Sequence, residues 1–221
     1  MHVSRIALIA ALALATAGCS SNSPQAQTLP AQSATPAPAA TSATATAAAA
    51  SSSQLTSELL AVTDLPAGWS TTATSSSSGG AASCKALDSG AWQSLPANAE
   101  ADFTGGTLGP ELAEKLAAGS ASQVAAAWQA FTAATAQCAS FTTPDSSGGT
   151  DKFSLAGLSF PSYGDGTYAF ALTVDADGVS ASGDVVVVRK GDVLVQIFAV
   201  GLTGVPVSVV EDAVGKAVAK A

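Results

Sequence analysis

Residues 166–200 read GTYAFALTVDADGVSASGDVVVVRKGDVLVQIFAV, and this stretch decides the fold. Large apolar residues alternate with small or polar ones over 168–174, as expected of a strand with one buried face. Turn residues follow at 175–178, and the continuous valines of 185–188 indicate a central strand covered on both faces. Lys190-Gly191 then predicts a second tight turn into a third strand. Sequential strands joined by short turns predict an antiparallel meander.

Helices are expected on either side of this meander in the sequence. Ser120 or Ser122 can cap a helix that runs to about Cys138. Its large residues recur at helical spacing on one face: Val124, Trp128, Phe131, Thr135 and Cys138. Pro206 suits the first turn of a closing helix, with Asp212 and Lys216 as an exposed ion pair. The buried face of that helix is expected to carry Val207, Val210, Val214 and Val218.

The remaining segments are expected to be short helices and strands. A helix is predicted at 55–60, and strands are predicted at 69–75, 99–104 and 153–158. Residues 107–117 are consistent with another strand, in competition with a helix over 111–117. The sequence therefore predicts a single α+β domain in which helices flank a curved antiparallel sheet.

The N-terminus carries the pattern of an export signal. A short basic start precedes the uncharged apolar run of 6–18, which suits a signal peptide and is too short to span a bilayer comfortably. The small residues before Cys19 resemble the lipobox of bacterial lipoproteins, in which the cysteine sulfur receives a diacylglyceryl group. We therefore expect a signal peptide at 1–18 and a lipid-anchored Cys19 on the outer face of the cell membrane. The alternative is an ordinary secretory signal followed by an unmodified cysteine.

An uncharged low-complexity tract follows the expected anchor. Residues 20–54 are Ala, Ser, Thr, Pro and Gln with one Leu and one Asn. Such a segment buries too little apolar surface to offset its ordering entropy, so 19–54 is expected to be a disordered tether spanning roughly 30–35 Å. The folded domain is expected over 55–221. The formal net charge of −8 leaves no basic footprint for nucleic acid, and nucleic-acid binding is not expected.

Two cysteines remain besides the expected anchor. Cys84 and Cys138 form an even pair in a domain that is expected to be exported, so a disulfide bond between them is predicted. The loop that it closes would contribute about 4 kcal/mol in the chain-entropy description. A reactive thiol or a metal ligand is the alternative, but no histidine lies near either cysteine. We expect no metal and no cofactor.

Catalytic motifs are absent from the expected mature chain. His2 is the single histidine and leaves with the signal, which excludes Ser-His-Asp and Cys-His arrangements. Neither Ser-x-x-Lys nor Gly-x-Ser-x-Gly occurs. Glu111 and Glu114 would share a helix face, and a solvated pair is expected rather than a catalytic one. Asp175 and Asp177 fit a hairpin turn better than a calcium loop. The sequence therefore predicts a protein that is not an enzyme.

Ligand binding remains, and a few aromatic residues are candidates for it. The loop 159–166 carries Phe160, Tyr163 and Asp165, and aromatic side chains on loops can line a ligand cleft. Trp92 is a further candidate. The alternative is that these aromatic side chains pack under the edge of the sheet.

The segment Leu59-Leu60 with Asp64-Leu65-Pro66-Ala67-Gly68-Trp69 resembles the opening of actinobacterial PknH-like extracellular sensor domains. The helix that ends near Cys138, the hairpin at Arg189-Lys190-Gly191-Asp192 and the closing helix also fit this family, so the resemblance covers most of 55–221. It implies a curved antiparallel sheet with flanking helices and a cleft.

The resemblance also implies a function. We expect a ligand-binding or sensory lipoprotein of the cell envelope whose ligand is a small molecule, a glycan or a protein. Any signalling would need a separate partner, because the sequence contains no kinase motif. The alternatives are an accessory protein for envelope assembly and a carrier of lipids or glycolipids.

Overall fold

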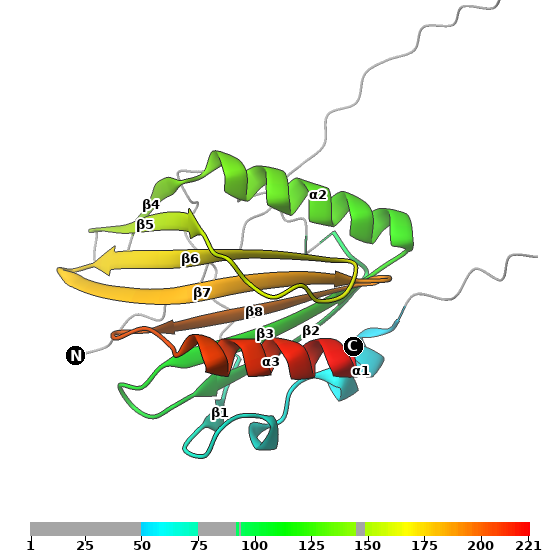
Figure 1. The fold of residues 1–221 in the computed structure, drawn as a ribbon, viewed down its shortest axis with the longest axis horizontal. Helices are drawn as coiled ribbons and strands as arrows, with labels where there is room; N and C mark the ends of the chain where they lie inside the picture. Colours follow the sequence, from blue (N-terminus) through cyan, green and yellow to red (C-terminus); the bar gives the residue numbers. More distant parts are fainter. Residues whose placement is uncertain (1–49, 75–91, 93, 145–148) are drawn as a thin grey trace, which may run out of the picture. The chain divides into compact units, whose positions relative to one another are not determined.

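The fold is built on one antiparallel sheet, in a computed structural model that describes residues 50–74, 92, 94–144 and 149–221. Within these residues the sheet has eight strands in the order β1-β2-β3-β8-β7-β6-β5-β4 (Figure 1). The strands are β1 Ser70–Thr72, β2 Ala97–Thr104, β3 Glu111–Ala118, β4 Ser140–Pro144, β5 Thr150–Gly157, β6 Gly166–Ala176, β7 Val179–Lys190 and β8 Val193–Gly201. The helices are α1 Ser52–Glu58, the short 3₁₀ helix η1 Val62–Asp64, α2 Ala121–Gln137 and α3 Val207–Lys220.

The predicted meander is the centre of this sheet. Strands β6, β7 and β8 follow one another as antiparallel neighbours. Asp177 and Gly178 form the first turn with φ angles of 51° and 77°, the left-handed pair that a two-residue hairpin requires. Gly191 begins the second turn with a φ of 59°. The α+β fold with an open antiparallel sheet is therefore confirmed.

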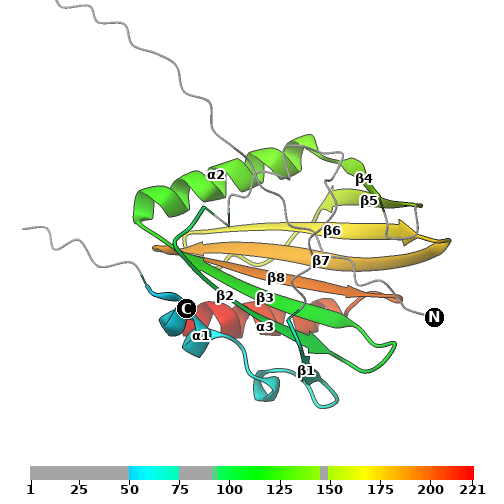
Figure 2. The ribbon, with the colours of Figure 1, turned by 180° about the vertical axis from the view of Figure 1, so that it is seen from behind.

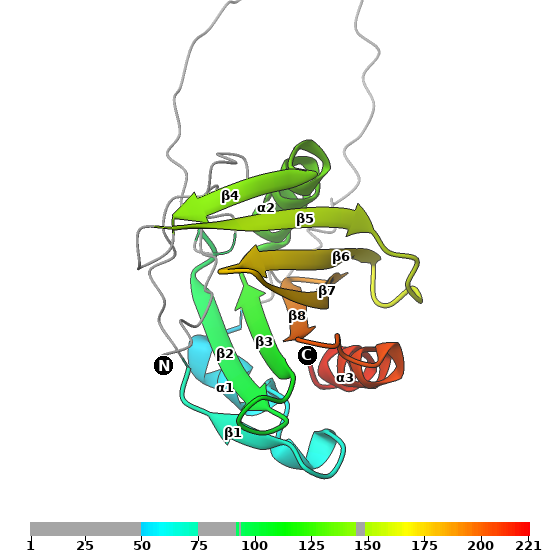
Figure 3. The same cartoon turned by 90° about the vertical axis from the view of Figure 1, so that its left-hand side faces the viewer.

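Helices cover both faces of the sheet. Leu116 faces α1 and α3 in one core cluster, whereas its neighbour Ala117 faces α2 in a second cluster. Figure 1 shows α3 in front of the strands, and Figure 2 shows the same helix behind them. Viewed from one end, the strand directions rotate progressively across the sheet, as the twist of an open sheet requires (Figure 3).

Helix α2 begins and ends where the sequence predicts. Ser120 is its N-cap and accepts a hydrogen bond from the Gln123 N–H, while the Gln123 side chain accepts one from the Ser120 N–H. Cys138 is the C-cap. This reciprocal arrangement is a capping box, which satisfies two backbone donors that the first turn would otherwise leave without partners.

The structure decides one open alternative and corrects several expectations. Residues 111–118 form the predicted strand and not the competing helix, because β3 pairs along its whole length with β2 on one side and β8 on the other. Val207 is 47% exposed instead of buried. Lys216 donates to the backbone carbonyl of Asp64, and no ion pair with Asp212 is found in the described part of the chain. Strand β4 was not predicted.

The predicted signal peptide and Cys19 lie outside the described residues, as does the tether up to residue 49. Helix α1 begins at Ser52, inside the range predicted as tether. Over the described ranges, no helix combines the length and the apolar character needed to cross a membrane.

Candidate functional site

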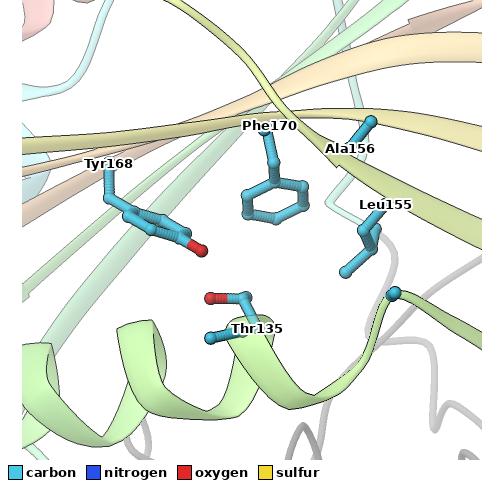
Figure 4. Close-up of a pocket in the computed structure, with 8 residues that line it drawn as sticks. Thr135, Leu155, Ala156, Tyr168 and Phe170 are labelled. Atoms are coloured by element: carbon cyan, nitrogen blue, oxygen red, sulfur yellow. The ribbon is translucent and has the colours of Figure 1, made fainter.

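A hollow lies between the C-terminal end of α2 and strands β5 and β6. Its volume is about 200 Å³. The residues that line it share one property, the absence of a charged side chain: Thr135, Ala136, Ala139, Leu155, Ala156, Gly157, Tyr168 and Phe170. Figure 4 shows the Tyr168 and Thr135 hydroxyl groups directed into the same space, with the Phe170 ring and the Leu155 side chain beside them. The hollow therefore combines two hydroxyl groups with aromatic and aliphatic walls.

The local sequence explains why these side chains meet. Tyr168 and Phe170 are two residues apart on β6, so they project from the same face of the sheet. Phe131 of α2 packs edge-on against Tyr168 with a ring separation of 6.2 Å. Thr135 lies one helical turn after Phe131, and its hydroxyl donates to the Phe131 carbonyl at 3.0 Å. The Thr135 oxygen thus retains lone pairs that can accept a hydrogen bond from a ligand.

The hollow is open along the edge of β5. Strand β4 pairs with β5 only as far as Ser154, and the Leu155 N–H donates to the Ala139 carbonyl just beyond that point. Because the Leu158 N–H bonds to β6, the alternating ladder directs the Gly157 N–H and C=O away from β6. A Cβ added to Gly157 would meet no atom within 4 Å. The backbone of Gly157 is therefore accessible at the mouth of the hollow.

An aromatic cluster supports the wall of the hollow. Phe131 is its centre, with ring centroids 6.3 Å from Trp92, 6.2 Å from Tyr168 and 6.2 Å from Phe170. The Trp92 indole N–H is buried, and no described residue accepts a hydrogen bond from it. Edge-on and tilted contacts of this kind stabilise beyond simple burial and restrict ring motion. Trp92 thus supports the cluster without lining the hollow.

The structure does not bring the four predicted binding residues together. Trp92 lies with α2 on one face of the sheet, whereas Phe160 and Tyr163 pack against the core cluster of α3 on the other face. The Tyr163 hydroxyl donates to the Glu211 carbonyl at 3.4 Å. Asp165 is exposed, and its carboxylate accepts a hydrogen bond from the Gly191 N–H at 2.7 Å. These last three residues hold the 159–166 loop against α3 and the β7–β8 turn.

The lining residues Tyr168 and Phe170 were predicted only as members of a strand. Their alternation with small residues indicated a buried face, and the same pattern is produced by an ordinary core strand. No motif in the sequence distinguishes the two cases. The hollow depends on where β4 stops pairing with β5, which is a property of the tertiary structure.

Glu114 is the least expected polar side chain of the protein. Its predicted role as one of a solvated pair with Glu111 is wrong, because adjacent strand residues alternate between faces and the two side chains point to opposite sides. Glu111 is exposed, whereas Glu114 is 0% exposed. Burial away from water raises the pKa of the Glu114 carboxyl to about 7, against the lowering effect of its hydrogen bond from Leu60.

The structure does not test the predicted pairing of Cys84 with Cys138. Cys138 is 1% exposed at the end of α2, while Cys84 lies outside the described residues, and the disulfide bond therefore stays a prediction. In the ranges that the structure describes, no group of three or more His, Cys, Asp or Glu side chains could hold a metal ion.

No protein-family model matches the chain, and no curated protein matches it. Among solved structures, the chain is similar to the crystal structure of the extracellular domain of PknH from Mycobacterium tuberculosis. The similarity covers 77% of this chain and 96% of that chain, with a TM-score of 0.60 and 14% sequence identity. At this identity the likeness shows a shared fold, in agreement with the architecture that the sequence resemblance implies.

Proposed function

We propose that this protein is an extracytoplasmic, membrane-tethered module that binds a small neutral ligand in the hollow between α2 and strands β5 and β6. The observation that carries the proposal is the composition of the hollow, where the Tyr168 and Thr135 hydroxyl groups and an accessible strand edge meet aromatic side chains. Binding sites commonly combine apolar walls with a small number of placed polar groups. Such a site supports a ligand-binding role.

The location is supported by two independent features. The sequence before Cys19 has the pattern of a lipoprotein signal, and the fold is similar to that of an extracellular domain. The uncharged tract of 20–54 would hold the domain roughly 30–35 Å from a lipid anchor. The ligand is therefore expected among the components of the cell envelope.

The chemistry of the lining restricts the class of ligand. A charged ligand would lose hydration without gaining a counter-charge, because none of the lining residues carries a charged side chain. A volume of about 200 Å³ is at or below the lower end of typical small-molecule sites and fits about one ring-sized group. A single sugar unit or a short neutral peptide segment meets both conditions. Aromatic walls suit the apolar face of a sugar ring.

The proposal is tested by binding measurements on a matched pair of variants. Neutral monosaccharides and short peptides from bacterial cell walls are titrated into the protein while backbone amide shifts are followed by NMR. We expect shifts at Gly157 and Tyr168. Tyr168→Phe removes the hydroxyl in the hollow and should weaken binding about three- to tenfold, as expected for one hydrogen bond. Tyr163→Phe removes a comparable hydroxyl on the other face and should leave affinity unchanged.

Other outcomes would overturn the proposal. Shifts centred on the 159–166 loop would move the site to the opposite face of the sheet. Equal affinity in Tyr168→Phe and wild type would show that the Tyr168 hydroxyl does not contribute to ligand binding. A lipid mass that co-purifies with the domain in native mass spectrometry would favour the carrier alternative.

One observation favours the accessory-protein alternative as a second candidate. Within the described residues, the strongly exposed large apolar side chains are Leu108, Val179, Leu202 and Val207. Register places their loops at one end of the sheet, since Glu111 pairs with Val200 and Ser182 pairs with Gly201. Exposed apolar side chains that gather in one region mark interaction surfaces. If this second candidate is correct, the double variant Leu108→Ser with Leu202→Ser should abolish the proximity labelling of a partner protein in cells. Its melting temperature should not fall.

A further inference from the structure

The segment that joins the tether to the sheet packs over one face as a separate layer. Leu55, Leu60 and Leu65 of this segment are 0%, 4% and 8% exposed and belong to the core cluster of α3. The Ser52 hydroxyl accepts a hydrogen bond from the Asn98 N–H of β2 at 3.1 Å. We call residues 50–65 the N-terminal latch. Any force or motion of the tether reaches the sheet through it.

The Glu114 side chain contacts the middle of this latch from the face of the sheet that the latch covers. Its Oε2 accepts a hydrogen bond from the Leu60 N–H at 2.5 Å, across a buried contact. Its Oε1 is buried and finds no hydrogen-bond partner among the residues that the structure describes. Burial in an apolar core costs an ionised carboxylate with one unpartnered oxygen more free energy than it costs the neutral acid, so the neutral form is favoured. The contact is therefore sensitive to whether the carboxyl carries a proton.

The charged groups around Glu114 do not neutralise it. From the latch, Asp64 faces it with the same charge, and Glu58 lies further along the same segment. From α3, Lys220 lowers its pKa through space, but the Lys220 ammonium donates to the Leu59 carbonyl at 2.6 Å and to the Asp64 carboxylate at 2.8 Å. Lys216 donates to the Asp64 carbonyl.

The neighbouring strands supply no counter-charge either. Glu114 is flanked by Ala101 on β2 and Ile197 on β8. Glu100 and Lys115 form an ion pair at 3.4 Å and, by strand alternation, lie on the opposite face of the sheet. The lysines of α3 thus bind the outer side of the latch, while Glu114 lies beneath the latch without an ion pair to any described residue.

We propose that the N-terminal latch is a pH-sensitive closure, held tightly when the Glu114 carboxyl carries a proton and loosened when that proton is lost. The direction follows from linkage. Burial in the closed state raises the pKa of the carboxyl from its ordinary value of 4.5 to about 7. An open latch would return the carboxyl to water, so the closed state binds the proton more tightly than the open state. The extra stability of the closed state is fully present below about pH 4.5 and is lost as the pH rises through about 7.

The consequence concerns the point where the domain meets its tether. At acidic pH, Glu114 and both lysines of α3 stabilise the closed latch. Above neutral pH, only the lysine contacts and the buried leucines stabilise it, and the ionised Glu114 carboxylate destabilises it. An opened latch would expose Leu55, Leu60 and the sheet face beneath them and would lengthen the connection to the membrane. This device does not depend on a ligand in the hollow.

Hydrogen exchange on the folded protein tests the proposal. Protection of the amides of residues 55–65 is measured at pH 5.0 and 7.5 and corrected for the intrinsic exchange rates. We expect protection of the Leu60 amide to fall about tenfold or more between the two pH values, and that of the β7 and β8 amides to change far less. Equal protection of the latch at both pH values would overturn the proposal.

Matched variants on one strand separate Glu114 from other carboxyl groups. Glu114→Gln keeps the acceptor for Leu60 but cannot lose a proton, so its latch protection should be independent of pH. Glu111→Gln removes an exposed acid from the same strand and should keep the wild-type pH dependence. An unchanged pH dependence in Glu114→Gln would overturn the proposal. If that variant does not fold, the wild-type carboxyl ¹³C shift of Glu114 decides: a midpoint near 7 supports the latch, and one near 4.5 overturns it.

Discussion

The backbone N–H of Leu60 donates a hydrogen bond to the side-chain carboxylate of Glu114, 54 residues away in the sequence. Glu114 is on the third strand of the sheet, and Leu60 lies in the connection between the first helix and η1. The contact joins the segment that precedes the sheet to a carboxyl that is fully buried. It also makes the stability of the N-terminal layer depend on a proton.

Global stability should respond to Glu114→Gln in a pH-dependent way. Because the folded-state pKa is raised to about 7, wild type keeps the carboxyl largely neutral at pH 5 and pays for an ionised buried group at pH 8. We expect the variant to match wild type within about 1 kcal/mol at pH 5 and to be more stable by up to about 3 kcal/mol at pH 8. Urea unfolding at both pH values measures the difference. A larger gain at pH 5 than at pH 8 would contradict the sign.

Gly183 of β7 should tolerate no side chain. A Cβ at this position would overlap the Ala199 carbonyl oxygen and lie 2.7 Å from the Val200 Cα, so strand β8 would have to move. Gly183→Ala should destabilise the protein by about 2 kcal/mol or more, measured by chemical denaturation. Gly157→Ala is the control, because a Cβ there meets nothing within 4 Å. Its effect should stay within about 1 kcal/mol. Equal losses in the two variants would exclude the proposed clash.

The capping box of α2 should contribute measurably to stability. Ser120→Ala removes the acceptor for the Gln123 N–H and should lower the free energy of unfolding by about 1 kcal/mol. Ser122→Ala removes a neighbouring hydroxyl whose contact is with the Ser120 hydroxyl at 3.1 Å. Thermal unfolding of both variants makes the comparison, with a change within about 0.5 kcal/mol expected for Ser122→Ala. An equal loss of stability in Ser122→Ala and Ser120→Ala would show that the capping box does not account for the effect.

The disulfide predicted between Cys84 and Cys138 should be visible in the intact mass. Protein produced in an oxidising compartment is expected to be two hydrogens lighter than the reduced chain. Reduction should destabilise the domain by about 4 kcal/mol if chain entropy accounts for the effect. Cys138→Ser should show the reduced stability without any response to reductant. An intact mass that matches two free thiols would disprove the pairing.

Elements with a strong local signal were predicted from the sequence. The three central strands have turn residues at the required positions, and α2 has a capping serine followed by apolar residues at helical spacing. Strand β3 carries weaker information. Its Glu-Leu-Ala-Glu-Lys-Leu composition suits a helix equally well, and pairing with β2 and β8 decides the outcome.

The candidate site could not be derived in the same way. Tyr168 and Phe170 line the hollow because β4 stops pairing at Ser154, a property that no local pattern encodes. The sequence left two alternatives open for the loop residues Phe160 and Tyr163, lining a ligand cleft or packing under the edge of the sheet. The structure places both residues against α3, because the turn around Gly164 brings the Asp165 N–H within 2.7 Å of the Arg189 carbonyl oxygen.

The sequence by itself determined the antiparallel meander, the capped helix α2 and the α+β class, since these follow from hydrophobic periodicity and turn chemistry between near neighbours. Only the tertiary structure decided whether the Glu114 carboxyl is buried and which protonation state it favours. The same strand position would be solvated if the face beneath Leu60 were open, and it is buried because α1, η1 and α3 close over it. Burial and charge environment depend on residues that are distant in the sequence, so the chemistry of this carboxyl belongs to the fold and not to its neighbours.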